Sequence, residues 1–467
     1  MEQKKGKAIR NFIKAFLFLL VLGWMLFKIM RVLDWKDTTG NYLSSMQQLY
    51  NTPDNTIDVA FLGSSHCYCS IYPAYLWEEE GIAAFDVAVS GQDKDSTYHA
   101  LKELLKSQKP KVVFVELFGL FFDRHAEEGN IYRNMLSMKT SQNSLELIRE
   151  YVEPERQMDF VLRWPIVHTR FWEVDKYDYV QYEPSVYGRG ADYQWHVQVA
   201  IPGEPNLGET EKLSEKNERW LKRLTELCER ERLDLVFFVA PFPITASKQR
   251  QLNAAKEFAE AHGIPLLDFN EMRYDVGLVD KTDFVDHFHC NAYGAKKVTG
   301  YVMNYLKERY QLEDHRTEAE YAAWDMDLKW YRHLEAQAFL KEAATPEDYL
   351  KQLSEMEGVI SIVSVTEGIS EESGKSLEIL GFPKNVVLEG GKYIFQEGRW
   401  EKIMGNGEME EFCMDLNEYD ALRIRSSQPA EISDIQINYE NCLNIELPIN
   451  VIPYDLFLKE RLKSLAY

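Results

Sequence analysis

The sequence is poor in basic residues and lacks any clustered set of cysteines. Its 467 residues include 53 lysines and arginines against 75 acidic residues, so the formal net charge is −22. This balance argues against a nucleic-acid-binding protein, which needs a basic face to neutralise phosphates. The six cysteines have neither zinc-site spacing nor disulfide-scaffold density. We expect most of them to be structural, although Cys67 and Cys290 flank the two candidate site stretches and could lie close together.

No internal repeat is present, and the chain is too long for one ordinary core. Two or three domains are expected at this length. Hydrophobic residues make up 45% of the chain and aromatic residues 13%. That content is ample for burying a core in each domain.

A basic amino terminus precedes a continuous apolar run over residues 15–27. The run has no polar face and no small-x-small cleavage site follows it, so residues 9–33 are predicted to form an uncleaved signal anchor. A secretory signal peptide and a buried helix of a soluble protein are the alternatives. We expect residues 1–36 to form a cytoplasmic tail and a transmembrane segment. Because basic residues tend to stay on the cytoplasmic side, the rest of the chain is predicted to lie outside the cytoplasm, anchored to the cell membrane.

Apolar strand-like runs alternate with helix-like segments over residues 37–312. Alternation of this kind implies right-handed βαβ units, a parallel sheet and an α/β fold. Five runs read as buried strands, beginning at Asp58, Ala83, Lys111, Asp234 and Pro265.

Residues 123–208 interrupt this alternation with a stretch rich in Trp, Tyr, His and Arg. We interpret the stretch as an insertion that folds over the sheet edge and could supply a substrate cleft, or equally as an aromatic packing patch without a ligand. His168 and Arg170 within it could bind an anionic or hydroxylated substrate. Alternatively, Arg170 forms an ion pair with one of the many acidic residues, which is an equally simple interpretation.

The remainder of the chain divides into a helical connector, residues 313–345, and an accessory domain, residues 346–467. Thr345 followed by Pro346 is typical of a helix start. Alternating apolar residues and glycine-marked turns then indicate a small mixed α/β or β-rich domain. Nothing catalytic stands out in this part.

Two stretches of the predicted α/β domain carry the residues of a nucleophilic site. Ser65 follows the first strand, and Asp286 and His289 lie before the last helix. Because the carboxyl ends of parallel strands meet at one edge, these loops can come together. His289 would accept the serine proton and Asp286 would orient the imidazole. The backbone amides of Ser65 and Gly91 are the natural donors to an oxyanion.

These residues resemble the first, second and fifth sequence blocks of the SGNH/GDSL hydrolases. The likeness rests on Gly63-Ser64-Ser65 after a hydrophobic strand, on Gly91 after the second strand and on Asp286-x-x-His289, and it covers roughly residues 57–312. It implies a flavodoxin-like three-layer α/β/α sandwich with a Ser-His-Asp triad. It also implies that the site uses neither a metal nor a cofactor.

The sequence departs from that family at two positions. Ser64 stands where the family has aspartate, which the Gly-x-Ser chemistry tolerates. The third strand ends in Glu116-Leu117-Phe118-Gly119 and not in Gly-x-Asn-Asp, so the usual asparagine donor is missing. Three alternatives remain open: Gln92 replaces the asparagine, the oxyanion hole has backbone donors alone, or catalysis is weak or lost.

Two further histidines adjoin the candidate triad. His66 and His287 could each line the pocket or serve as scaffold residues. A metal site formed by His287, His289 and Asp286 is the lesser alternative, because no further ligand cluster accompanies them.

The anchor and the Gly-Ser-Ser-His variant most resemble the envelope-modifying members of the superfamily, such as the D-alanyl-lipoteichoic acid transfer protein and the alginate O-acetyltransferases. The resemblance implies a multispanning membrane-bound O-acyltransferase as partner and a cell-envelope glycan as substrate. We therefore expect an acyltransferase or esterase acting on O-acyl groups, most simply acetyl. A catalytically silent glycan-binding or scaffold component of an envelope polysaccharide modification or export complex is the alternative.

Overall fold

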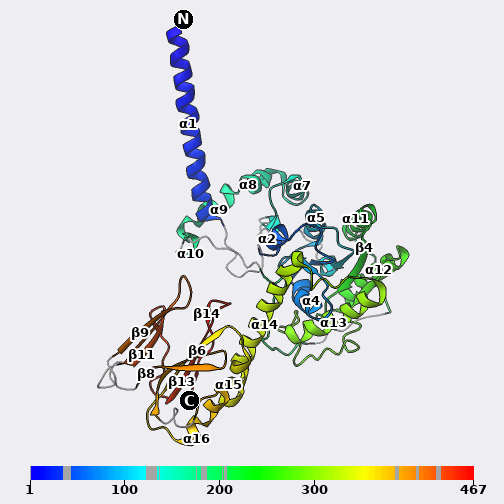
Figure 1. The fold of residues 1–467 in the computed structure, drawn as a ribbon. Helices are drawn as coiled ribbons and strands as arrows, with labels where there is room; N and C mark the ends of the chain where they lie inside the picture. Colours follow the sequence, from blue (N-terminus) through cyan, green and yellow to red (C-terminus); the bar gives the residue numbers. More distant parts are fainter. Residues whose placement is uncertain are drawn as a thin grey trace. The chain divides into compact units, whose positions relative to one another are not determined.

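A computed structural model shows two compact units, Met1–Asp327 and Leu328–Tyr467, joined within one long helix (Figure 1). The residues that the structure describes are 2–34, 44–121, 134–135, 137–174, 176–179, 187–201, 203, 208–383, 389–405, 410–426 and 433–467. The predicted insertion at 123–208 therefore lies partly outside the described residues. The boundary between the units falls inside α14 (Ala322–Glu342).

The amino-terminal segment forms a single helix, α1 (Glu2–Leu33). Within it, the 25 residues Ile9–Leu33 are long and apolar enough to cross a membrane. Their side chains are almost all exposed. Length and composition are equally compatible with a signal sequence.

The predicted parallel sheet is confirmed, with five strands in the order β2-β1-β3-β4-β5. All four strand pairs are parallel. The central strands are apolar except at Glu116, the last residue of β3, and Asp234, the first residue of β4, because helices cover both faces of the sheet. The strands are β1 (Val59–Gly63), β2 (Ala84–Ala88), β3 (Val112–Glu116), β4 (Asp234–Val239) and β5 (Leu266–Asp268).

Helices α5 and α11 lie on one side of this sheet, and α4 and α13 lie on the other (Figure 1). On the second side, Tyr305 of α13 meets Phe114 of β3, which stacks on Phe61 of β1 at 4.9 Å.

The helices of the first unit are α2 (Ser44–Asn51), α3 (Ser65–Tyr68), α4 (Pro73–Glu80), α5 (Lys94–Leu104), η1 (Phe118–Phe121), α7 (Gln142–Tyr151), η2 (Pro154–Arg156), α8 (Gln157–Leu162), α9 (Trp164–Val167), η3 (His168–Trp172), α10 (Lys176–Tyr179), α11 (Glu215–Glu231), α12 (Ala246–Ala261), α13 (Ala292–Arg309) and η4 (Ala319–Tyr321).

The second unit is β-rich, as predicted, with two antiparallel sheets. One sheet has the order β12-β11-β10-β9 and the other β14-β13-β6-β7-β8, with β15 paired to β13. Its elements are α15 (Pro346–Glu355), β6 (Val359–Val365), α16 (Glu371–Gly374), η5 (Lys375–Leu380), β7 (Gly391–Gln396), β8 (Arg399–Met404), β9 (Glu410–Asp415), β10 (Ala421–Ser426), β11 (Ser433–Ile437), β12 (Glu440–Asn441), β13 (Ile449–Asp455), β14 (Glu460–Arg461) and β15 (Leu465–Ala466).

Alternation along β6 explains why this unit has two cores. Val359, Val363 and Val365 pack in a cluster that includes Leu350 of α15. Ile360 and Ile362 pack in the other cluster, with side chains of β10 and β11. Successive side chains of a strand point to opposite faces, so one strand contributes to both cores.

A buried ion pair ties the outer edge of β2 to the start of α14. Arg189 hydrogen-bonds to the carboxylate of Asp327 and, at 2.9 Å, to Oγ1 of Thr52. The carbonyl of Arg189 accepts from the amide of Asp86 in β2 at 2.8 Å. Burial raises the pKa of Asp327 to about 6 although Arg189 opposes the shift. Three separate segments of the chain thus meet at one charge pair.

We predict that Arg189→Met lowers the free energy of unfolding by about 3 kcal/mol, because it leaves Asp327 buried without its counter-charge. The double variant Arg189→Met/Asp327→Leu should recover part of that loss. Arg309→Met, which breaks the exposed pair with Glu308, is the control and should change stability by under about 0.5 kcal/mol. Urea titrations in detergent measure the free energy of unfolding of all three variants. An equal effect at Arg189 and Arg309 would contradict the prediction.

Candidate active site

The first strand ends in a turn that fits only glycine. A Cβ atom on Gly63 would lie 2.6 Å from the Cβ of Glu116 and 3.0 Å from that of Cys67, so a side chain there would clash. Ser64 then caps α3, and its Oγ accepts from the amide of His66 at 3.4 Å. Ser65 is therefore the first residue of a short helix at the carboxyl edge of the sheet.

The structure brings the three predicted catalytic side chains together. Nε2 of His289 lies 2.8 Å from Oγ of Ser65. Nδ1 of the same ring lies 2.9 Å and 3.1 Å from the two carboxylate oxygens of Asp286. With the proton on Nδ1, the serine hydroxyl donates to Nε2, which is the arrangement required of a general base.

Asp286 is oriented by its own loop and stays ionised. Its Oδ1 accepts from the amides of Phe288 at 2.6 Å and His289 at 2.8 Å. Partial burial raises the pKa of Asp286, but the hydrogen bonds and charge of His289 and these amides outweigh it and lower the pKa to about 2. A permanent carboxylate at this position fixes the imidazole tautomer and stabilises the imidazolium.

Asn291 holds the loop that carries Asp286 and His289, a role that we did not predict. Its Oδ1 caps α13, and its Nδ2 donates to the carbonyl of Thr282 at 2.7 Å. An antiparallel bridge between Phe284 and Cys290 closes the same loop. An asparagine directly before an apolar helical pattern was the available signal.

Gly91, the predicted backbone donor to an oxyanion, lies in the loop that follows β2. Gly91 has φ +67°, which favours glycine, and follows the second strand. Gln92 is buried, and its Nε2 donates to the carbonyl of Val87 at 3.4 Å and to Oγ1 of Thr97 at 3.3 Å. These contacts join Gln92 to β2 and α5, so its replacement of the missing asparagine stays a prediction.

β3 ends at Glu116. In the family that the sequence resembles, the loop after this strand carries the asparagine that donates to the oxyanion. The side chain of Glu116 is 2% exposed, and its Oε1 accepts from the amide of Phe118 at 2.8 Å. Burial raises the pKa of Glu116 to about 8, against the hydrogen bonds from Phe118 and Ala240. The group is therefore mostly protonated at neutral pH and adds no negative charge beneath Ser65.

His66 is a buried neighbour of the triad. Its ring stacks on that of His289 at 4.7 Å and lies 3.7 Å from that of Phe118. Burial lowers the pKa of His66 well below its ordinary value, and the nearby His289 adds to the effect. His66 is thus a neutral packing residue behind the base.

The geometry does not favour the metal alternative. Both ring nitrogens of His289 face Ser65 and Asp286, so neither has a lone pair directed at an ion shared with His287. His287 is exposed, and its Nε2 lies 3.2 Å from Nε2 of Gln198.

His168 and Arg170 lie at the end of α1. Nη1 of Arg170 donates to the carbonyls of Leu33 at 2.6 Å and Asp34 at 3.0 Å, and its Nη2 donates to Asp178 at 3.0 Å. His168 is exposed, and its Nδ1 lies 2.9 Å from the carbonyl of Pro165. Among the contacts of the described residues, none joins either side chain to the triad.

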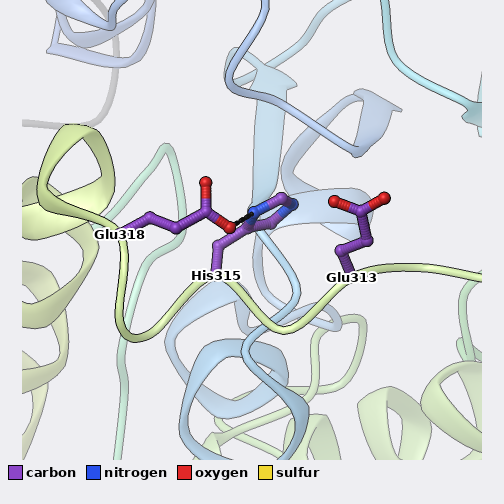
Figure 2. Close-up of side chains that lie close together, drawn as sticks. All are labelled: Glu313, His315 and Glu318. Atoms are coloured by element: carbon purple, nitrogen blue, oxygen red, sulfur yellow. Dashed lines mark hydrogen bonds and ion pairs between the residues drawn. The ribbon is translucent and has the colours of Figure 1, made fainter.

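A separate cluster in the first unit contains Glu313, His315 and Glu318, whose nearest ligand atoms lie within 4.8 Å of one another. Figure 2 shows His315 between the two glutamates. Nδ1 of His315 lies 2.7 Å from Glu318, and Nε2 lies 3.1 Å from Asp58. Because both ring nitrogens already face carboxylates, we interpret the cluster as a charged link to the start of β1 and not as a metal site.

The cysteines next to the site are free, buried thiols. Burial raises the pKa of Cys67 well above its ordinary value, as do Asp86 and Glu116, and burial raises the pKa of Cys290 to about 12. Both thiols stay protonated at neutral pH, which suits the structural role expected of them.

No family model matches the chain, and no curated protein matches it. The case for a function therefore depends on the geometry of its own residues.

We predict that Glu116→Gln reduces the loss of stability at alkaline pH. The folded pKa of about 8 lies above the ordinary value of 4.5, so the folded protein binds the extra proton between these values. The stability associated with the protonated form is complete below pH 4.5 and is lost as pH rises through 8, at a cost on the order of 5 kcal/mol. Melting temperatures between pH 5 and 9 should fall less in Glu116→Gln than in the native protein. Parallel curves would contradict a buried, neutral Glu116.

Proposed function

We propose that this protein is a membrane-anchored, extracytoplasmic SGNH-type acyltransferase or esterase that acts on O-acetyl groups of a cell-envelope glycan. The observation that carries the proposal is the hydrogen-bonded chain Ser65–His289–Asp286 at the carboxyl edge of a parallel sheet. A serine with a base in reach and a carboxylate behind the base is an arrangement that serves acyl transfer.

In the proposed reaction, Oγ of Ser65 attacks the acyl carbonyl while His289 takes the hydroxyl proton. The amides of Ser65 and Gly91 stabilise the oxyanion, and the leaving alcohol receives the proton from His289 as the C–O bond breaks. In the second half, His289 deprotonates a sugar hydroxyl or water, which attacks the acyl-enzyme and releases Ser65. Transferase and esterase differ only in that acceptor.

Two further features support the details of the proposal. The strand order β2-β1-β3-β4-β5 is the order of flavodoxin-like sheets, so it favours the sandwich that the resemblance implies. The apolar helix Ile9–Leu33 supports a membrane anchor. An anchored enzyme can receive acyl groups from a multispanning membrane-bound O-acyltransferase, which would then be its partner.

A catalytically silent scaffold or glycan-binding role is the second candidate. The observation that favours it is Glu116. This buried acid ends β3, and the asparagine donor that follows the third strand in the resembling family is missing. With backbone donors alone, the site would stabilise an oxyanion less well.

We expect a fluorophosphonate to label the native protein covalently at Ser65, because phosphonylation needs the activated serine and the oxyanion donors. Ser65→Ala should abolish labelling. Asp286→Asn should slow it by about 10³-fold, because the imidazole loses its orienting charge. Ser354→Ala changes an exposed serine of α15 and is the control. Gel fluorescence and peptide mass spectrometry measure the adduct, and an unlabelled native protein would favour the scaffold.

A further inference from the structure

An exposed apolar patch covers α8, α9, η3 and α10 of the first unit. Six of its large side chains are 39% to 83% exposed, far more than side chains that pack in a core. They are Met158, Leu162, Trp164, Phe171, Trp172 and Tyr179. The patch belongs to the aromatic stretch that we expected to supply a substrate cleft or a packing patch. A contiguous apolar surface of this kind is typical of a site that another molecule covers.

Helix α8 is apolar on its outer side as well as on its inner side. Phe160 faces inward and is 3% exposed, whereas Met158 and Leu162 are each 58% exposed. Residues four positions apart lie on the same face of a helix, so these two side chains form one outward stripe. A surface helix of a soluble protein has polar residues on that face. The outer side of α8 is therefore built for a medium other than water.

The aromatic rings of the patch contact one another and stay exposed. The ring centres of Phe171 and Trp172 lie 4.3 Å apart, yet the two side chains are 53% and 83% exposed. Trp164 stacks on the exposed ring of His168, with ring centres 6.3 Å apart. These contacts align the rings along the surface and leave their outer faces uncovered.

The patch is attached to the carboxyl end of α1. Helix α1 contacts α9, η3 and α10, and Figure 1 shows α9 and α10 beside its lower end. Leu33, the last residue of α1, is 5% exposed, and Val167 of α9 is fully buried. Arg170 donates to the carbonyls of Leu33 and Asp34, and Nη1 of Arg163 lies 3.5 Å from the carboxylate of Asp34. Two arginines of the patch segment thus bind the end of the apolar helix.

The length of this helix sets the level of the patch in a membrane. The 25 residues Ile9–Leu33 rise about 38 Å, and the hydrocarbon core of a bilayer is about 30 Å thick. A bilayer that contains this segment therefore has a headgroup region at Leu33. Because the patch contacts the same end of α1, it lies at that level.

The local charge is suited to a lipid surface. Residues 157–172 contain Arg163 and Arg170 against one acid, Asp159, in a chain of net charge −22. The segment thus lacks the negative charge that lipid phosphates would repel. Tryptophan and tyrosine are enriched at the headgroup level because their rings are apolar and their edges are polar.

We propose that this patch lies in the headgroup region of the bilayer and binds lipid. Its rings and the outer side of α8 contact the upper part of the acyl chains, and Arg170 and Arg163 hold the patch at the end of α1. The first unit is then attached to the membrane surface by two elements, the spanning helix and the patch. The inference rests on the proposed membrane anchor and is independent of catalysis.

The test places the photocrosslinker benzoylphenylalanine at Phe171 of the full chain in nanodiscs of phosphatidylglycerol and phosphatidylcholine. Trp24 of α1 is the positive control, because it is 62% exposed on the spanning segment. Glu308 is the negative control, because its side chain is 71% exposed and α13 lies well away from α1 in Figure 1. We expect lipid adducts at Phe171 and Trp24 and none at Glu308, measured by mass spectrometry.

A second variant tests the attachment of the patch. Arg170→Met removes the hydrogen bonds to the carbonyls of Leu33 and Asp34. The adduct yield at Phe171 should then fall relative to the yield at Trp24 in the same variant. Arg309→Met changes an exposed arginine of α13 and should leave this ratio unchanged. An equal ratio in the native protein and Arg170→Met would overturn the attachment that we assign to Arg170.

Three results would overturn the lipid-binding patch. One is adducts at Trp24 without adducts at Phe171, which would leave the anchor intact. Another is equal yields at Phe171 and Glu308, and the third is crosslinks from Phe171 only to another protein in cell membranes. Failure at both Phe171 and Trp24 would overturn the anchor together with the patch. Fluorophosphonate labelling of Ser65 tests the acyl-transfer proposal separately from all of these results.

Discussion

The hydrogen bond between Ser65 and His289 is the contact on which the proposed chemistry depends. It joins residues 224 positions apart, and only the parallel arrangement of the sheet makes that possible. The loops after the first and last strands open on the same edge. Gly63 allows Glu116 to approach the turn, and Asn291 fixes the loop of the base. The scaffold thus holds Ser65 and His289 in contact, as the proposed nucleophile and base require.

The charges around this contact are arranged in a protein that is strongly acidic overall. Asp286 is ionised behind the imidazole, whereas Glu116 is neutral because it is buried. A second carboxylate beneath Ser65 would repel a developing oxyanion, so the protonation of Glu116 matters for the proposed reaction. Lys248, over the ring of Phe242, supplies a positive charge near His66. Burial and hydrogen bonding, more than net charge, decide the sign of the field at the site.

Local patterns in the sequence were sufficient for much of the fold. Apolar runs that end in small or polar residues predicted the five strands, because buried parallel strands need no alternation. Glycine directly after a helical segment is typical of a helix end, and Gly81 ends α4 in a left-handed conformation. Thr345 and Pro346 predicted the start of α15. The β-rich second unit followed from alternation and from glycines at turns.

Other features depend on contacts that no local pattern encodes. Gln92 is polar and adjoins Gly91, yet it packs inward because Val87 and Thr97 offer it partners. Arg170 was a candidate ligand for a substrate, but it binds the end of α1, some 137 residues earlier in the chain. The rings of Phe118 and Phe121 in η1 contact that of Phe242, more than 120 positions later in the chain. Contacts between residues this far apart in the sequence can be identified only from the three-dimensional structure.

Trapping an acyl-enzyme would show whether Ser65 is a nucleophile. The native protein would be mixed with 4-nitrophenyl acetate, quenched in acid within the first turnover and digested for mass spectrometry. We expect one added acetyl group on Ser65, with a burst of nitrophenolate equal to the protein concentration. Nitrophenolate release without an acetylated Ser65, or an acetyl group on another residue alone, would contradict it.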